Sequence, residues 1–192
     1  MNAWSASPGK YVQEAMRNLE TYLDKQGKGI KLPKRATAPW LNDYMSELDD
    51  MPELGAEMIS HYQSLVGILH WMVELGHMEM IVEVSILASH MAMPHEGHLL
   101  AAYHVFLYIK RHHISCLVFD PSYPEIYKFV FMSHVQEAIP PNAPPPLGKD
   151  MDLRIYVDSD HAGNKSNHRS RTGFFIYTNS DLIMWTSKTR QP

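Results

Sequence analysis

The stretch RIYVDSDHAGN, residues 154–164, decides how the last part of the chain folds. Its first residues alternate their side chains in the way that is typical of a β-strand, and the strand ends in two carboxylates, Asp158 and Asp160. If the strand persists, residues two apart lie on the same face. Clustered carboxylate oxygens are what Mg²⁺ prefers as ligands, although a solvated turn in which aspartate caps the strand explains the same pair.

Two further strands follow this stretch. The sequence predicts strands over Leu153–Asp158, Gly173–Thr178 and Leu182–Ser187, and Asn179-Ser180 with Asp181 is a plausible hairpin turn between the last two. The end of the chain is therefore expected to be a small unit of antiparallel strands.

Helical periodicity dominates the first part of the chain. Ser7-Pro8 indicates a helix start, and a basic, proline-broken connector and an acidic loop follow that helix. Three amphipathic helices with short links then predict a small bundle, at about 56–76, 78–90 and 97–112. A short strand is expected at Ser115–Phe119, with Cys116 as a buried, inert thiol within it.

These patterns predict an α+β chain in four parts. A helix with its connector (1–55) precedes a helical bundle that ends in a short strand (56–121). A proline-rich linker (122–152) then leads to the β-rich end (153–192).

Several motifs in a fixed order resemble copia-type retrotransposon Pol polyproteins. The family's ribonuclease H domain begins with a strand ending D-x-D-x-A-G, then has R-S-x-x-G, and then a hairpin ending W-x-S-K-x-Q. The matching residues here are Asp158, Asp160, Ala162, Gly163, Arg169, Ser170, Gly173, Trp185, Ser187, Lys188 and Gln191. Upstream, the stretches at 46–55, 62–76, 83–98 and 104–113 are similar to the segment that joins reverse transcriptase to ribonuclease H, whereas the resemblance is weakest at 122–150.

The resemblance implies a fold and a chemistry. The helical part corresponds to the C-terminal region of a reverse transcriptase, and the three strands correspond to an incomplete ribonuclease H-like domain. Asp158 would be a catalytic residue that binds Mg²⁺, with Asp160 only its neighbour. Arg169, Ser170 and Arg171 would contact an RNA–DNA hybrid, although a solvated polar loop explains them equally well.

The resemblance also indicates what is missing. The family's polymerase motif Y-x-D-D does not occur, and the other ribonuclease H carboxylates would lie beyond Pro192. One carboxylate cannot hold two Mg²⁺ ions, so we expect no hydrolysis by this chain alone. We also expect the strands to leave an apolar face and edges exposed, with poor solubility or loose packing as the result.

The histidines invite a zinc interpretation that their spacing does not support. His90, His95 and His98 lie close together, but H-E-G-H is one residue shorter than the zinc-protease motif needs between its glutamate and second histidine. His98 and His104, six apart, project to different sides of a helix. Ordinary surface and half-buried histidines are the expectation.

Charge and composition limit the functional classes. The net charge is −4, yet Pro8–Arg35 carries +4 and Leu153–Pro192 carries +3. No apolar run is long enough to span a membrane, and the chain has a single cysteine. We therefore expect an intracellular protein without membrane partners, in a cytoplasmic particle or the nucleus. Expected partners are the rest of the polyprotein and the hybrid. The alternatives are a protein-binding module built on the helical part and a non-specific nucleic-acid binder that uses the basic ends.

Overall fold

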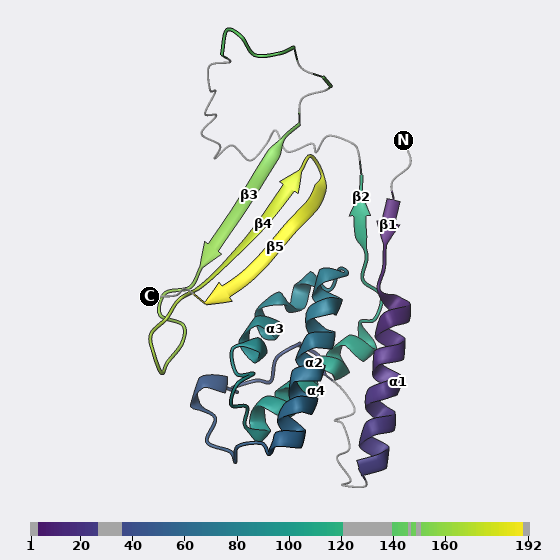
Figure 1. The fold of residues 1–192 in the computed structure, drawn as a ribbon, viewed down its shortest axis with the longest axis vertical. Coiled ribbons are helices and arrows are strands. Elements are labelled where there is room, and N and C mark those ends of the chain that lie inside the picture. Colours follow the sequence, from purple (N-terminus) through teal and green to yellow (C-terminus); the bar gives the residue numbers. More distant parts are fainter. Residues whose placement is uncertain (1–3, 27–35, 121–139, 146, 149–150, 190–192) are drawn as a thin grey trace.

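A computed structural model describes residues 4–26, 36–120, 140–145, 147–148 and 151–189. Within them lie a helical body and two antiparallel sheets, which confirms the α+β class (Figure 1). The main helices are α1 (Gly9–Gln26), α2 (Ala56–Glu74), α3 (Ile81–Ala88) and α4 (Glu96–Arg111).

The helical body is held together by one apolar core. Tyr62 and Leu69 of α2, Leu87 of α3 and Phe106 of α4 are completely buried in it, as is Val12 of α1. In α2 the buried side chains recur at helical spacing and form one apolar stripe, whereas α4 is buried over most of its circumference. The Tyr62 hydroxyl donates to the carbonyl of Leu87 at 2.7 Å, which satisfies the buried polar group at this packing point.

Helix α1 belongs to this body, which extends the predicted three-helix bundle to four helices. Val12, Ala15, Met16 and Leu19 are buried against the core, and α1 contacts both α2 and α4. On the surface, Lys110 of α4 forms an ion pair with Glu20 at 2.5 Å. The connector expected to separate this helix from the bundle therefore does not separate it in space.

A short 3-10 turn, η1 (Ser46–Leu48), lies at the end of the body where α4 begins. The segment after it runs alongside the start of α4: the Leu54 N–H donates to the Pro94 carbonyl and the Glu96 N–H to the Pro52 carbonyl, both at 3.0 Å. A second 3-10 turn, η2 (Met78–Met80), leads directly into α3. The helix predicted over about 78–90 is therefore one 3-10 turn and a shorter α-helix.

Two short strands, β1 (Trp4–Ala6) and β2 (Leu117–Phe119), pair antiparallel above the helices. The predicted strand at 115–119 is thus present in its last three residues, whereas β1 was not predicted. Cys116 precedes β2 and is exposed, so the expectation of a buried thiol was wrong. The side chains of this ribbon are exposed apart from Leu117, which is half-buried, and β2 also contacts β5.

The second sheet contains β3 (Leu153–Ser159), β4 (Arg171–Thr178) and β5 (Asp181–Thr189), in that order. All three strands and the turn Asn179-Ser180 between β4 and β5 are as predicted. Asn179 has φ of 55°, a left-handed conformation that asparagine tolerates better than most residues. Its side-chain oxygen also accepts the Asp152 N–H at 3.0 Å, which ties the turn to the start of β3.

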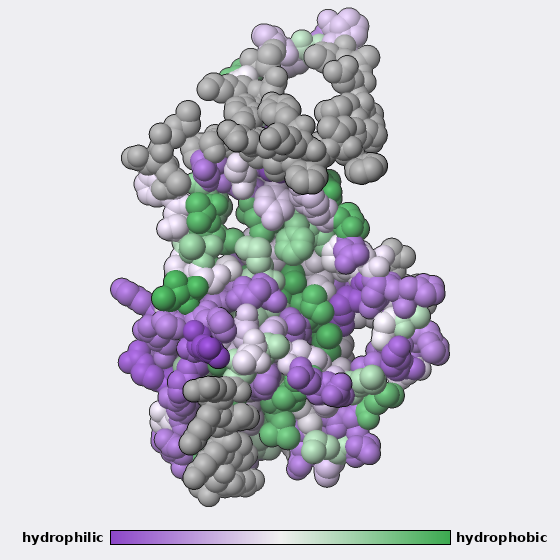
Figure 2. Space-filling model, turned by 180° about the vertical axis from the view of Figure 1, so that it is seen from behind, coloured by the Kyte–Doolittle hydropathy of each residue, from purple (hydrophilic) through white to green (hydrophobic). Residues whose placement is uncertain are grey.

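The two faces of this sheet have different surroundings. Strand β5 contacts α3, and Trp185 packs against the helical core. The opposite face carries Ile155, Val157 and Met184, with exposed fractions of 57%, 68% and 53%. Viewed from behind, hydrophobic and near-neutral residues spread across the middle of the molecule, above a more hydrophilic lower half (Figure 2).

Most of the predicted linker, 122–152, lies outside the described residues, and its described part contains no helix or strand. Among the residues that the structure does describe, no helix is long and apolar enough to cross a membrane.

Candidate functional site

Asp158 lies where the sequence analysis expected it, near the carboxyl end of β3. It is exposed, pairs with Gly173 of β4 in the sheet register, and lines a pocket of about 460 Å³. We call this the strand-end pocket. Its floor comes from the sheet and its wall from α3, and its lining residues are Ile81, Val82, Tyr156, Val157, Asp158, Ser159, Asp160, Arg171, Gly173, Phe175, Thr186 and Ser187.

Asp160 also lines the pocket, but its carboxylate is hydrogen-bonded to the backbone of Arg171. It accepts the Arg171 N–H at 2.5 Å, while the Asp160 N–H donates to the Arg171 carbonyl at 3.0 Å. A Cβ added to Gly163 would come within 1.9 Å of the same carboxylate, so the glycine leaves room for it. Asp160 therefore closes the loop between β3 and β4.

Arg171 turns towards the helical body. Its guanidinium donates to the Ser85 hydroxyl of α3, and that hydroxyl donates to the Ser187 carbonyl of β5 at 2.7 Å. Burial lowers the pKa of the Arg171 guanidinium, and the Asp160 carboxylate only partly offsets that effect. Arg171 thus joins the sheet to α3, and its charge is less available to a phosphate than the sequence suggested.

Arg169 and Ser170 lie in the loop between β3 and β4. The Ser170 hydroxyl accepts the Ala162 N–H at 3.1 Å and so braces the loop. Arg169 is exposed and lines a small hollow of about 110 Å³ with Asp160 and Glu47. Of the three residues expected to contact nucleic acid, Arg169 alone presents an exposed side chain.

The described residues of the strand-end pocket do not by themselves fit a Mg²⁺ site. Mg²⁺ needs about six oxygen ligands in near-octahedral geometry. Asp158 supplies one free carboxylate, whereas the Asp160 carboxylate is bonded to the Arg171 backbone. Further oxygens, from other protein or from a bound phosphate, would be needed to hold the ion.

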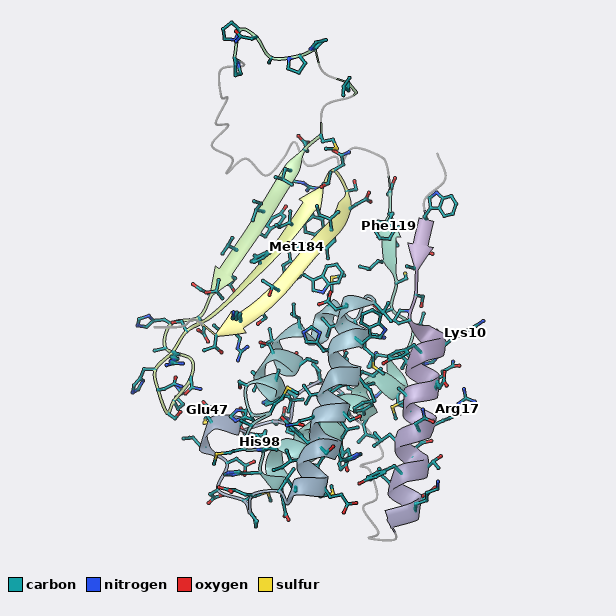
Figure 3. All side chains as sticks on the ribbon, in the orientation of Figure 1. Lys10, Arg17, Glu47, His98, Phe119 and Met184 are labelled. Carbon is teal, nitrogen blue, oxygen red and sulfur yellow. The ribbon has the colours of Figure 1, made fainter. Side chains whose placement is uncertain are left out.

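A second cluster joins η1 to the start of α4, and it contains Asp49, His95 and His98. One ligand atom from each lies within 4.8 Å of the others. Asp49 Oδ2 is 3.9 Å from His98 Nδ1, and these two side chains are only 2% and 3% exposed. We call this group the Asp49–histidine cluster; Figure 3 shows His98 beside Glu47 at this end of the helical body.

Backbone groups fix the orientation of both histidines. His95 Nδ1 is 2.9 Å from the Asp49 carbonyl, and His98 Nε2 is 2.9 Å from the Ser46 carbonyl. Because a carbonyl can only accept, these nitrogens carry the protons. The lone pair of His98 Nδ1 accepts the His95 N–H at 2.8 Å, which forms a capping box at the start of α4.

The protonation states in the cluster follow from burial and these bonds. Burial would raise the pKa of the Asp49 carboxyl, but hydrogen bonds from Tyr44 Oη at 2.6 Å and from the Met51 N–H at 2.9 Å outweigh it and lower the pKa. Burial lowers the pKa of His98. Burial, with His98 stacked at 4.1 Å, lowers the pKa of His90 to about 4. At neutral pH the cluster therefore combines an ionised Asp49 carboxylate with a neutral His98 imidazole.

Sequence reasoning found the three neighbouring histidines and missed Asp49. Asp49 and His95 are 46 positions apart, and the pairing of 52–54 with 94–96 brings them together. Both stretches, 46–55 and 83–98, were recognised as similar to the same family segment. The resemblance alone carried no information on their contact in space.

Comparison of the chain with protein-family models, with curated proteins and with solved structures gives no match in any of the three.

Proposed function

We propose that the chain is part of a copia-type retrotransposon Pol polyprotein, whose activities would be RNA-directed DNA synthesis and hydrolysis of the RNA strand of a hybrid. The proposal rests on the ordered motifs of residues 154–191 and on those upstream. The observation that carries it is the position of Asp158, exposed at the end of β3 on the rim of the strand-end pocket. A carboxylate so placed can take part in a metal site that other oxygens complete.

In this proposal the chain contributes to hybrid binding and does not hydrolyse RNA by itself. Arg169 is an exposed cation in the loop that follows β3, and it would contact a phosphate of the hybrid. Asp158 would supply one metal-binding carboxylate opposite the scissile phosphate. The wall of the pocket on α3 is apolar and consists of Ile81 and Val82.

Hybrid binding by the full chain tests the proposal. We expect affinity for a labelled RNA–DNA hybrid in Mg²⁺ to fall steeply with salt and to weaken in Arg169→Ala. Lys10→Ala is the matched control, because Lys10 is an exposed cation on α1, across the helical body from the loop (Figure 3). Equal losses in the two variants would favour non-specific binding by the basic ends. If the wild type cleaves RNA and Asp158→Ala abolishes the cleavage, the expectation that the chain does not hydrolyse RNA by itself is wrong.

A protein-binding module is the second candidate, and the exposed sheet face favours it. Ile155, Val157 and Met184 form an apolar surface of the kind that often marks an interaction site. Retained self-association or partner binding in Arg169→Ala, without any hybrid binding by the wild type, would support this candidate over the first.

A further inference from the structure

The Asp49–histidine cluster has the donor set of a transition-metal site. Two imidazole nitrogens and one carboxylate oxygen lie within 4.8 Å of one another, and Asp49 and His98 are almost completely buried. With a water molecule as fourth ligand, this combination matches the three-ligand zinc sites of proteins. The cluster shares no residue with the strand-end pocket and is independent of the function proposed above.

The hydrogen bonds around the cluster are those that a metal site requires. A histidine that binds a metal through one nitrogen almost always donates its other N–H to a carbonyl or carboxylate. His95 Nδ1 does so to the Asp49 carbonyl, and with the proton on Nδ1 the lone pair of the ring is on Nε2. His98 does so to the Ser46 carbonyl, and Asp49 in turn accepts from Tyr44 and Met51. Each prospective ligand is thus already oriented by its own partner.

We propose that Asp49, His95 and His98 bind one Zn²⁺ ion through Oδ2, Nε2 and Nδ1. Ligands about 2.0–2.1 Å from a tetrahedral ion are about 3.4 Å apart. The 3.9 Å between Asp49 Oδ2 and His98 Nδ1 therefore has to shorten slightly.

Zinc would compete with one existing contact. The His98 Nδ1 lone pair now accepts the His95 N–H, so the capping box opens when the ion binds. The positive end of the α4 dipole opposes a cation here, and the Asp49 carboxylate counters it. The site therefore couples zinc binding to the start of α4.

Zinc titration of the full chain at neutral pH tests the proposal. We expect one tight equivalent in the wild type, and affinity at least about 10-fold weaker in Asp49→Asn and in His95→Gln. His70→Asn is the matched control, since His70 is an exposed histidine of α2 outside the cluster. We expect this variant to bind like the wild type. Bound Co²⁺ should give the absorption of a four-coordinate site in the wild type and control only.

Hydrogen exchange distinguishes zinc bound at this site from zinc bound elsewhere on the protein. We expect Zn²⁺ to speed hydrogen exchange of the His95 amide, because Nδ1 of His98 no longer accepts it. His95→Gln keeps Asp49 and His98 in place, so the test holds even if Asp49→Asn fails to fold. The same zinc affinity in all four chains, or no zinc binding by the wild type, would overturn the proposal.

Discussion

Gly97 gives the Asp49 carboxylate its place beside α4. A Cβ added to Gly97 would lie 2.0 Å from Asp49 Oδ2, closer than any two such atoms can approach. The absence of a side chain at the second residue of α4 is therefore what allows a buried carboxylate to reach His98. The close approach of the Asp49 side chain to α4 depends on this one position.

Replacing Gly97 by alanine should destabilise the protein by roughly 1–3 kcal/mol, because overpacking displaces Asp49 from its hydrogen bonds. The free energy of unfolding in urea measures this effect. Gly67→Ala in α2 is the control, since nothing lies within 4 Å of a Cβ there. That change should stabilise the protein by about 0.5–1 kcal/mol, as expected for a helical glycine. Equal effects of the two changes would refute the packing argument.

Acid should weaken the fold through His90. Its pKa in the folded chain is about 4 against an ordinary value of 6.5, so the unfolded chain binds the proton more tightly. The contribution of His90 to stability is therefore complete above pH 6.5 and is lost as the pH falls towards 4. His90→Gln should flatten the decline of unfolding free energy over that window. An unchanged pH slope in the variant would show that His90 does not titrate in this way.

Removing the Ser85 hydroxyl should loosen the sheet from the helices. Ser85 is the point at which α3 meets both Arg171 and Ser187. In Ser85→Ala we expect faster hydrogen exchange across β4 and β5, with α2 and α4 unchanged. Ser89→Ala is the control, because the Ser89 hydroxyl bonds only to the Ile86 carbonyl of its own helix at 2.6 Å. Equal hydrogen exchange in the two variants would argue against Ser85 as the link between the sheet and α3.

The exposed sheet face should make the protein associate as its concentration rises. Strand β3 pairs with β4 along one edge, and Ile155 and Val157 lie open beside its other edge. Ile155→Lys should reduce association measured by light scattering, because a lysine disfavours edge pairing. Leu100→Lys, at a lone exposed leucine of α4, should change it less. Strong amide protection throughout β3–β5 in a monomer would contradict the expectation of loose packing.

The regular elements could be predicted because their patterns are local. The alternation in β3–β5 and the turn at Asn179 are confirmed within one or two residues at each strand end, and α2 and α4 follow the expected apolar spacing. The short strand β1 could not be predicted, because its stability comes from pairing with β2, more than a hundred positions away.

Packing between distant segments is what the sequence analysis could not supply. The burial of Val12 and Met16 places α1 in the core, although their side chains do not distinguish a separate amphipathic helix from a packed one. The sequence analysis did not single out Asp49, because its buried contact with His98 depends on tertiary pairing. Arg171 was expected to face phosphate, but Ser85, from a different part of the chain, takes up its guanidinium.

The ribbon of β1 and β2 has a consequence for the order of folding. It joins Trp4 to Phe119 through three residue pairs, so its formation closes a very long loop for few contacts. The helices, whose backbone hydrogen bonds are local, can form and pack before this closure. The ribbon should therefore form after the helices have packed, and its opening should be the first step by which the native helical body unravels.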